Sequence, residues 1–282
     1  MTIRDALKKG TINLKVKGIE NPNITSRLLM QFVLNKPRQY LLVYDETELT
    51  SNEEKQYFKN IEKITNGIPL QHITHQQEFM KMNFYVDENV LIPRADTETL
   101  VEEVIQIAKK NNAKKILDMC TGSGAIAISL AKYIEGSEIT AVDISSKALR
   151  VAKMNSKNNN VENQITFVES NLFENVSLNK FDIIVSNPPY IKKKVINNLD
   201  VQVQKEPIIA LDGGIDGLDF YRKIISESYK YLKYNGYLCF EIGYDQKEEV
   251  IELIQKEKIY NNIYSKKDLY DNDRIVVAKI CE

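Results

Sequence analysis

Apolar residues recur at helical spacing through about the first 67 positions of the chain. One stripe follows residues 23–26, and a second follows Ser51 and Glu54, which have the spacing of a capping box. These stripes contain, in order, Leu28, Leu29, Phe32 and Val33, then Tyr57, Ile61 and Ile64. The second helix is expected to end at Asn66-Gly67. Such stripes are typical of a small bundle's core, so we predict a helical domain over residues 1–75.

The pattern then changes to short alternating segments of β-prone residues. Residues 82–86 alternate in this way, and Asp87-Glu88-Asn89 is a turn signal. The combination predicts a β-hairpin, with its turn at 87–89, that links two domains over residues 76–95.

From Pro93 onward the pattern alternates between helix and buried strand. A first helix is expected to be capped by Asp96 or Thr97, with Leu100, Val101, Val104 and Ile105 inward. Strands are expected at 115–119, 139–143, 165–168, 181–185, 237–241 and 275–278, and further helices at 125–131, 145–156, 218–232 and 248–254. This alternation predicts an α/β domain over residues 96–282, a doubly wound and mostly parallel sheet with helices on both faces. Ligands bind such sheets beyond the carboxyl ends of the strands.

Three of those strand ends have a pattern that suits a nucleoside. Gly122 and Gly124 allow a tight turn and a close approach of the backbone to a ligand. Asp143 ends the next strand and can accept hydrogen bonds from both hydroxyls of a ribose. Asn171 and Leu172 follow the third strand and can meet the edge and face of an adenine. The glycine turn alone is also compatible with a nicotinamide enzyme or with a turn of no special role.

Asp118 shifts the balance between the two cofactors. A dinucleotide needs its pyrophosphate at the helix amino terminus, where a carboxylate at the strand end would repel it. S-adenosylmethionine has no phosphate and carries a cationic amino group and a sulfonium, which Asp118 would favour. We therefore expect S-adenosylmethionine.

The fourth strand end indicates the reaction. Pro188 and Pro189 fix φ and remove two N–H donors, so the rim is stiff and presents acceptors, namely the Asn187 side-chain oxygen and the Pro188 carbonyl. Two such acceptors suit a planar –NH₂ group, whose lone pair is delocalised and poorly nucleophilic. Holding both hydrogens while the nitrogen pyramidalises directs that lone pair at a methyl donor, and Tyr190 can cover one face of the planar group.

Together these motifs resemble the class I S-adenosylmethionine-dependent methyltransferases, and nearly the whole chain is similar to the HemK-like protein-(glutamine N(5))-methyltransferases of peptide chain release factors. The matching segments are 67–71, 78–79, 90–94, 96–98, 118–125, 186–191, 206–207, 210–214 and 272–274. The resemblance implies a seven-stranded sheet and, as methyl acceptor, the glutamine of a release factor's Gly-Gly-Gln loop. It implies that Asn187, Pro188, Pro189 and Tyr190 bind the substrate, with Asn187, Pro188 and Tyr190 catalytic. It also implies a cofactor site made of Cys120, Thr121, Gly122, Ser123, Gly124, Asp143, Asn171, Leu172 and Asn187.

Three residues depart from the family pattern. Ala95 replaces a proline, and Leu172 replaces an often aromatic residue, which bears on adenine stacking and not on the reaction. Cys120 stands where a glycine is usual, a change that the turn accommodates if φ at this position is negative.

Composition and charge narrow the setting. The formal net charge of 282 residues is −1, which disfavours non-specific binding of nucleic acid or of anionic lipid. No stretch is apolar and long enough to cross a membrane, the first residues do not resemble a signal peptide, and three widely spaced cysteines suit a reducing compartment. We expect a cytoplasmic monomer with no direct nucleic-acid contact. His72 and His75 lack the further ligands that a metal site needs, and neither is placed to act as a general base.

Two alternatives stay open. The same rim serves enzymes that methylate an exocyclic amine of a nucleic-acid base, although such enzymes flip the base and usually carry a basic recognition region. A non-enzymatic cofactor-binding protein would not need the Asn187–Pro189 rim. We expect the helical domain to dock a protein substrate.

Overall fold

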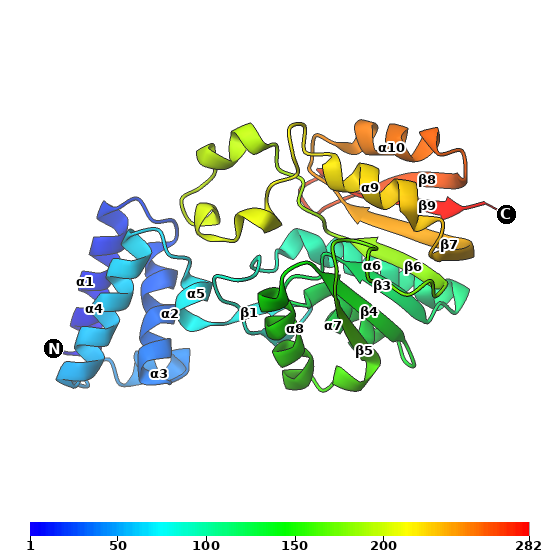
Figure 1. The fold of residues 1–282 in the computed structure, drawn as a ribbon. Helices are drawn as coiled ribbons and strands as arrows, with labels where there is room; N and C mark the ends of the chain where they lie inside the picture. Colours follow the sequence, from blue (N-terminus) through cyan, green and yellow to red (C-terminus); the bar gives the residue numbers. More distant parts are fainter. Residues whose placement is uncertain (282) are drawn as a thin grey trace. The chain divides into compact units, whose positions relative to one another are not determined.

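The computed structural model describes residues 1–281 and separates them into two units (Figure 1). The first contains Met1–His75 together with Asp200–Lys205, and the second contains the rest of the described chain. The second unit therefore includes the segment between residues 76 and 95.

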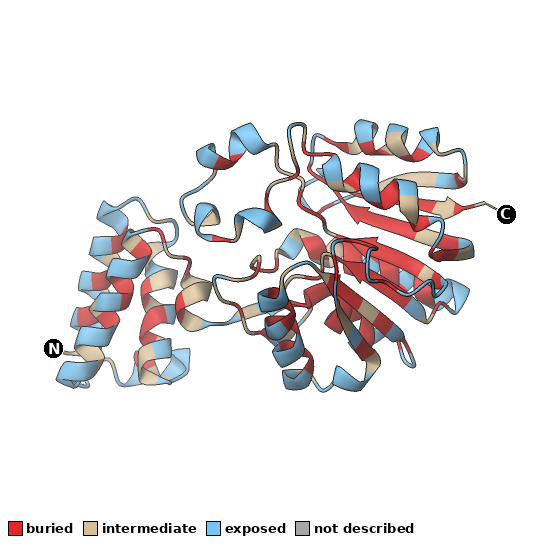
Figure 2. Cartoon of the chain, in the orientation of Figure 1, coloured by how far each residue is buried: buried red, intermediate tan, exposed pale blue. Residues whose placement is uncertain are grey.

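The first unit is a helical bundle. Its helices are α1 (Ile3–Val16), α2 (Pro22–Leu34), α3 (Arg38–Val43), α4 (Ser51–Thr65) and α5 (Leu70–Thr74), with a short 3₁₀ helix at Val203–Lys205. The predicted stripe of Tyr57, Ile61 and Ile64 is fully buried, and it packs with Leu14 and Leu29. Figure 2 shows the buried positions of these helices facing one another. The sequence prediction of a bundle core is confirmed here.

The buried face of α2 differs from the prediction. Leu28 and Phe32 are exposed, whereas Ser26 and Met30 are buried with Leu29. The burial of Ser26 has a physical reason, because its hydroxyl is 2.6 Å from the Tyr57 hydroxyl and is satisfied inside the core. The prediction assigned only apolar residues to the buried face of the helix. It therefore excluded this serine and chose a face that includes the exposed Leu28 and Phe32.

The capping box of α4 lies one residue earlier than predicted. The Thr50 hydroxyl accepts from the Glu53 N–H at 3.3 Å, and Glu53 Oε2 accepts from the Thr50 N–H at 2.8 Å. Ser51 is the first residue of the helix instead. Because Thr50–Glu53 and Ser51–Glu54 share one spacing, the sequence alone did not distinguish them.

Segment 200–205 belongs to the first unit through a close contact at Gly67. Gly67 has φ +85°, and a Cβ built there would lie 2.4 Å from Val201 Cγ1. Glycine is required by both the backbone conformation and the space. The helix end predicted at Asn66-Gly67 is confirmed, and the contact that comes with it joins residues far apart in the sequence.

The second unit opens with a short hairpin of β1 (Gln77–Phe79) and β2 (Met82–Phe84), paired antiparallel. Its turn is Met80-Lys81, where both residues have positive φ, as tight hairpins require. The predicted turn at 87–89 is therefore wrong for the hairpin. Asp87 instead makes a local turn in which its Oδ1 accepts from the Asn89 N–H.

A seven-stranded sheet follows, in the order β5-β4-β3-β6-β7-β9-β8. Its strands are β3 (Lys115–Met119), β4 (Glu138–Asp143), β5 (Ile165–Glu169), β6 (Phe181–Ser186), β7 (Leu232–Glu241), β8 (Tyr260–Lys267) and β9 (Asp273–Ile280). The first five strands in that order pair parallel, and β9 pairs antiparallel with β7 and β8. The predicted doubly wound, mostly parallel sheet is confirmed.

Sequence patterning did not locate β8. It is an edge strand with irregular pairing, and Asn262 within it has positive φ. Only Tyr260 of its eight residues is buried, so neither alternation nor a continuous apolar run marks it.

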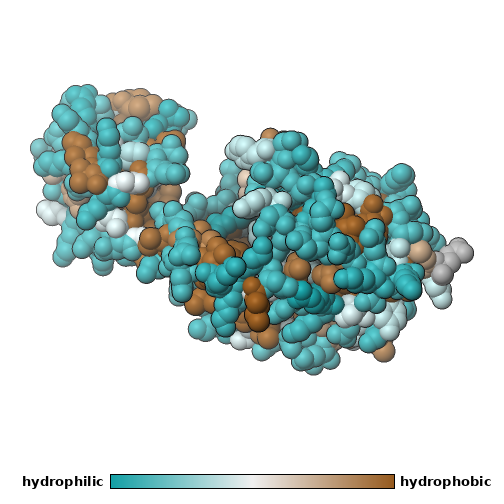
Figure 3. Space-filling view, turned by 90° about the horizontal axis from the view of Figure 1, so that it is seen from above, coloured by the Kyte–Doolittle hydropathy of each residue, from teal (hydrophilic) through white to brown (hydrophobic). Residues whose placement is uncertain are grey.

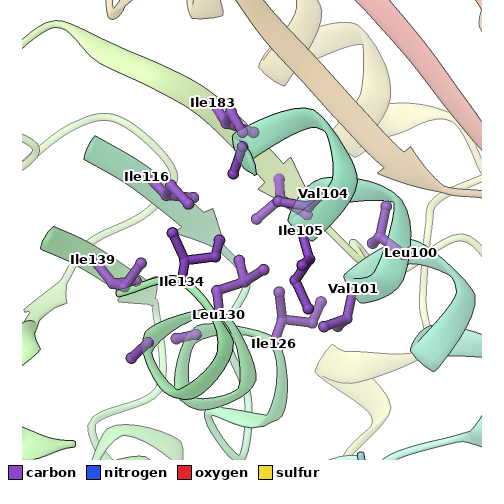
Figure 4. Packing of buried hydrophobic residues seen from close by; sticks show 14 of the residues in the cluster. Leu100, Val101, Val104, Ile105, Ile116, Ile126, Leu130, Ile134, Ile139 and Ile183 are labelled. Carbon is purple, nitrogen blue, oxygen red and sulfur yellow. The ribbon is translucent and has the colours of Figure 1, made fainter. Parts of the chain in front are cut away.

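Helices cover both faces of the sheet. They are α6 (Ala95–Asn111), α7 (Ala125–Tyr133), α8 (Ser146–Asn158), α9 (Asp219–Ser228) and α10 (Lys247–Lys256), with 3₁₀ helices at Glu162–Gln164, Lys193–Asn198 and Ile208–Ala210. Successive strand residues serve opposite cores, for example Ile116 with α6 and α7, and Leu117 with α9 and α10. Figure 4 shows Leu100, Val101, Val104 and Ile105 of α6 meeting the first of these cores, as predicted.

The start of α6 and the extent of α9 differ from the prediction. The helix α6 begins at Ala95 after Arg94, so Asp96 and Thr97 lie inside its first turn and neither caps it. The helix expected over 218–232 ends at Ser228, because Leu232 is already the first residue of β7. The 218–232 segment is apolar at helical spacing throughout, and strand pairing with β6 overrides that pattern.

The bundle predicts an unusual response at Gly10 in α1. Alanine usually stabilises a helix interior by about 1 kcal/mol over glycine. A Cβ at Gly10, however, would lie 2.1 Å from the buried Tyr57 hydroxyl. Gly10→Ala should therefore lower the free energy of unfolding by about 1–3 kcal/mol in chemical denaturation. The exposed neighbour gives the control, because Lys9→Ala should change it by less than about 0.5 kcal/mol. A more stable Gly10→Ala variant would contradict this packing.

Candidate active site

Four parallel strands end level with one another. In the hydrogen-bonded register, Met119 of β3 is opposite Val142 of β4 and Ser186 of β6, and Ser186 is opposite Phe240 of β7. The residues that follow these positions therefore meet at one edge of the sheet. The chain runs from β3 to β5 on one side and then returns to β6 on the other, so this edge is a topological switch point, where ligands bind in open α/β sheets.

A pocket with a cavity volume of about 150 Å³ lies at this edge. The sequence-predicted residues that line it are Cys120, Gly122, Asp143, Asn171, Leu172, Asn187 and Pro189. Further lining residues, which the sequence did not identify, include Asn89–Leu91, Ser145, Ser170, Pro207, Ile209, Ala210, Phe220 and Lys223. Among the lining residues of the described chain, Asp143 is the one acid and Lys223 the one base.

The glycine turn is held from beneath by Asp118, which is fully buried. Its Oδ2 accepts from the Thr121 hydroxyl at 2.6 Å and from the Ala127 N–H in the first turn of α7 at 3.1 Å. Its Oδ1 has no hydrogen-bond partner within residues 1–281. Burial raises the pKa of Asp118 to about 7, against these two hydrogen bonds.

Thr121, Ser123 and Gly124 shape the turn and do not line the pocket. The Thr121 carbonyl accepts from the Gly124 N–H, and the Ser123 carbonyl accepts from the Asn155 side chain. Gly124 has φ +82°, and a Cβ there would press on Ile128 and Ala152. Of the predicted turn residues, only Cys120 and Gly122 face the pocket.

Cys120 has φ +65°, so the condition on which the turn was expected to accommodate a cysteine, a negative φ, is not met. The left-handed conformation costs about 1–2 kcal/mol for a residue with a Cβ, which explains the preference for glycine here. Burial raises the pKa of the Cys120 thiol above its usual value, which disfavours the nucleophilic thiolate. Cys120 thus occupies a strained position in the pocket wall.

Asp143 lies across from the turn at the end of β4. Its Oδ2 accepts from the Gly122 N–H at 2.8 Å, and its Oδ1 accepts from the Ser145 N–H at 2.9 Å. Burial raises the pKa of Asp143, opposed by the backbone N–H groups of Ser145, Gly122 and Ile144. Each carboxylate oxygen can accept a second hydrogen bond, so this fixed group keeps acceptor capacity toward the pocket.

Asn171 and Leu172 come from the loop after β5. The Asn171 amide nitrogen donates to Glu174 Oε1 at 2.7 Å, which leaves its oxygen free of that contact. Leu172 is buried, has φ +51°, and belongs to the apolar core beneath the pocket. The pair gives this wall one polar and one apolar side chain.

The proline rim follows β6. Asn187 and Pro189 line the pocket, whereas Pro188 and Tyr190 are not among its lining residues. Gly213 packs against this rim, and a Cβ there would lie 2.7 Å from the Tyr190 Cα. The Tyr190 carbonyl accepts from Gln246 Nε2 at 3.0 Å, and no group in residues 1–281 donates to the Pro188 carbonyl. The rim is therefore fixed on its outer side, with one carbonyl left without a protein donor.

Glu206 joins two segments that line the pocket. Its side chain is 2% exposed, its Oε2 accepts from the Ile92 N–H at 3.0 Å, and its Oε1 pairs with Arg94 Nη2 at 2.5 Å. Both segments, 90–94 and 206–207, are among those that resemble the methyltransferase family. Nothing in the sequence, however, indicated that the Glu206 carboxylate connects them.

Asn187 has two polar neighbours that sequence analysis missed as site residues. Its Nδ2 donates to Thr97 Oγ1 of α6 at 3.2 Å. Burial raises the pKa of Glu241, the last residue of β7, and polar interaction of its carboxyl group with the side chains of Thr97 and Asn187 lowers it. The sequence did contain an indication of this site residue, because Glu241 is an acid at the end of a predicted strand, and that strand pairs with β6. Only strand order, which the sequence did not supply, makes it adjacent to Asn187.

Three further features of the described residues concern metal binding, membrane spanning and apolar patches on the surface. Within residues 1–281, no group of three or more His, Cys, Asp or Glu side chains is arranged to hold a metal ion, and no helix is long and apolar enough to span a membrane. Figure 3 shows hydrophobic patches between larger hydrophilic areas. Exposed apolar side chains include Leu42, Val43 and Tyr44 in the first unit.

Two family models match the chain. Residues 5–74 match the PrmC N-terminal domain, and residues 95–210 match the methyltransferase small domain. A ribosomal protein L11 methylase from Lactobacillus delbrueckii subsp. bulgaricus covers 73% of this chain and 90% of its own, with a TM-score of 0.51 and 20% identity. This solved structure supports the fold alone.

Full-length relatives are more similar. The release factor glutamine methyltransferase of Clostridium acetobutylicum is 44% identical over 99% of this chain and 98% of its own length. The enzyme of the same name from Clostridium botulinum is 38% identical over 99% of both. With the methyltransferase sheet and the amino-terminal helical domain both in place, the chain belongs to the release factor glutamine methyltransferase family.

Proposed function

We propose that this chain transfers a methyl group from S-adenosylmethionine to the side-chain amide nitrogen of the glutamine in the Gly-Gly-Gln loop of a peptide chain release factor. The observation that carries the proposal is one pocket lined by both Asp143, a ribose-type acceptor, and Asn187, an amide-type acceptor. The family relationship supports the same reaction.

The residues present fit S-adenosylmethionine better than a dinucleotide. Asp118 Oδ1 is buried without a partner among residues 1–281, beneath the turn where a pyrophosphate would otherwise lie. A cationic ligand offsets such a carboxylate, whereas a phosphate is repelled by it. Asp143 would hold the ribose, and Asn171 and Leu172 would meet the adenine.

The chain's own residues account for the acceptor side. When bound, S-adenosylmethionine supplies an electrophilic methyl group. Asn187 Oδ1 and the Pro188 carbonyl would each hold one hydrogen of the glutamine amide, because the Asn187 nitrogen is turned toward Thr97 and the Pro188 carbonyl has no donor in residues 1–281. These contacts strengthen as the nitrogen pyramidalises and gains positive charge, so they favour the transition state over the bound substrate. The nitrogen afterwards loses one proton to water.

The direct test is transfer of a labelled methyl group by the full chain. We expect label in a purified, folded release factor at its glutamine and none in duplex or single-stranded nucleic acid. Label in nucleic acid alone would instead support methylation of an exocyclic base amine, and the absence of any transfer would favour a non-enzymatic cofactor-binding protein.

Asp143→Ala should weaken binding of S-adenosylhomocysteine by at least about tenfold in calorimetric titration, because a hydrogen bond to a charged group contributes about 1.5–3 kcal/mol. Asp182 gives a matched control, since its carboxylate also accepts from two backbone N–H groups but lies at the other end of the sheet. Asp182→Ala should leave the affinity unchanged. Equal affinities of wild type and Asp143→Ala would remove Asp143 from the cofactor site.

Asn187→Ala should lower the single-turnover rate by about 10²–10³, as removal of one preorganised polar group does elsewhere. Asn187→Asp keeps an acceptor oxygen and should retain partial activity, whereas Asn187→Leu should have almost none. The affinity for S-adenosylhomocysteine should change little in all three. A Leu variant within a few-fold of wild type would make Asn187 a structural residue only.

We also propose that the first unit docks the release factor. A Gly-Gly-Gln peptide should then be a much poorer substrate than the folded factor, measured as kcat/KM with the full chain. Replacing the exposed Leu42 and Val43 together by serine should raise KM for the folded factor and leave the rate with the peptide unchanged. If the double variant and wild type are equal with the folded factor, the apolar α3 surface has no part in docking.

A further inference from the structure

Glu241 is a buried acid that the reaction described above does not use. Its side chain is at the end of β7, the residue is 1% exposed, and Oε2 has no hydrogen-bond partner among residues 1–281. The register that pairs Ser186 with Phe240 makes Glu241 level with Asn187. A buried acid beside a residue that faces the substrate is a candidate functional group.

No ion pair within the described residues 1–281 offsets this burial. Arg274 of β9 is the nearest cation in electrostatic effect, but its Nη2 pairs with Asp96 at 3.2 Å and with Asp268 at 3.1 Å. A buried carboxylate without a cation is costly to maintain. The fold therefore keeps an acidic side chain where an apolar one would be more stable, which calls for a role beyond packing.

An ionised Glu241 fixes which group donates and which accepts along the series Asn187, Thr97 and Glu241. A threonine hydroxyl has one hydrogen to donate, and a carboxylate only accepts. If Thr97 donates to the Glu241 carboxylate, its oxygen is left to accept, and it accepts from Asn187 Nδ2 at 3.2 Å. The amide nitrogen of Asn187 must then face Thr97, and its Oδ1 must face the other way.

We propose that Glu241 is a positioning residue which, directly and through Thr97, fixes the Asn187 amide with Oδ1 turned toward the methyl acceptor. The inference rests on the proposed function, since it explains how Asn187 presents an acceptor to a glutamine amide. A protonated Glu241 can itself donate to Thr97, so the direction of the hydrogen bonds is lost. The ionised form is therefore the active one.

The charge has a second effect on the same atom. Positive charge develops on the acceptor nitrogen during the transfer, and a buried carboxylate behind Asn187 stabilises it. Burial raises the pKa of Glu241 to about 7, opposed by the hydrogen bond from Thr97 and the charge of Arg274, with Asp96 raising it further. The phenols of Tyr190 and Tyr221, whose pKa values burial raises, also face this group. Neither phenol changes charge near neutral pH.

The sign of the pH dependence follows. Because the carboxylate is the active form, the single-turnover rate of wild type should rise about tenfold from pH 6 to pH 8, with an inflection near 7. Glu241→Gln keeps the shape but can donate to Thr97. It should lower the rate by about 10- to 100-fold, as loss of a partner that orients a metal ligand does, and its rate should be independent of pH.

A second pair of variants keeps the test valid if Glu241→Gln folds poorly. Thr97→Val removes the hydroxyl at nearly constant shape and should also lower kcat, whereas Thr97→Ser should restore it. Affinity for S-adenosylhomocysteine should stay within about twofold of wild type in every variant, because these residues do not line the nucleoside side of the pocket.

Glu103 gives the matched control. It is also a buried glutamate, but it pairs with Lys266 and Tyr264 away from the pocket. Glu103→Gln should lower stability and leave the rate and its pH profile unchanged. A wild type that does not methylate release factor would overturn the proposed function. An active wild type with an unchanged rate and profile in Glu241→Gln, or in Thr97→Val, would overturn only this inference.

Discussion

The level ends of β4, β3, β6 and β7 are the constraint on which the site depends. Parallel hydrogen bonding fixes Met119 opposite Val142 and Ser186, and Ser186 opposite Phe240. A shift by one residue would turn each side chain to the opposite face of the sheet. The same register therefore maintains both hydrophobic cores and the alignment of the residues at the edge. Backbone pairing alone brings Asp143, Asn187 and Glu241 to the same edge of the sheet.

Buried carboxylates are the cost of this arrangement, and each is used differently. Asp118 supports the glycine turn with one oxygen and leaves the other without a partner among residues 1–281. Glu206 is satisfied by Ile92 and Arg94 and connects two walls of the pocket. Glu241 has the polar, uncharged side chains of Thr97 and Asn187 as neighbours and no ion pair among residues 1–281. Because full satisfaction lowers the cost of a buried charge, the incompletely satisfied acids mark the positions where a ligand or a reaction is expected to act.

The sequence predicted the elements that depend on local pattern and missed those that depend on pairing. Strong periodicity located the α6 face and the central strands, and the glycine turn and the proline rim identified two parts of the pocket. Sequence analysis did not identify Thr97 and Glu241 as site residues, because each acts on a neighbour that is distant in sequence. The positive φ of Cys120 could not be predicted from the sequence for a related reason. A left-handed residue with a Cβ is tolerated only where the surrounding fold compensates for it.

The Asn187 side-chain amide can still rotate although the main chain of the rim is restrained. This remaining freedom explains why residues that orient the amide are useful. The two prolines fix the backbone after β6, Gly213 leaves no room behind Tyr190, and Gln246 binds the Tyr190 carbonyl. These contacts restrain the main chain that presents the Pro188 carbonyl. Rotation of the Asn187 amide by half a turn is the freedom that backbone packing does not remove, because both orientations have nearly the same shape. Only hydrogen-bond direction distinguishes a donor from an acceptor at that point, so the control must come from a chemically one-sided partner. An ionised carboxylate, which accepts and never donates, meets that requirement.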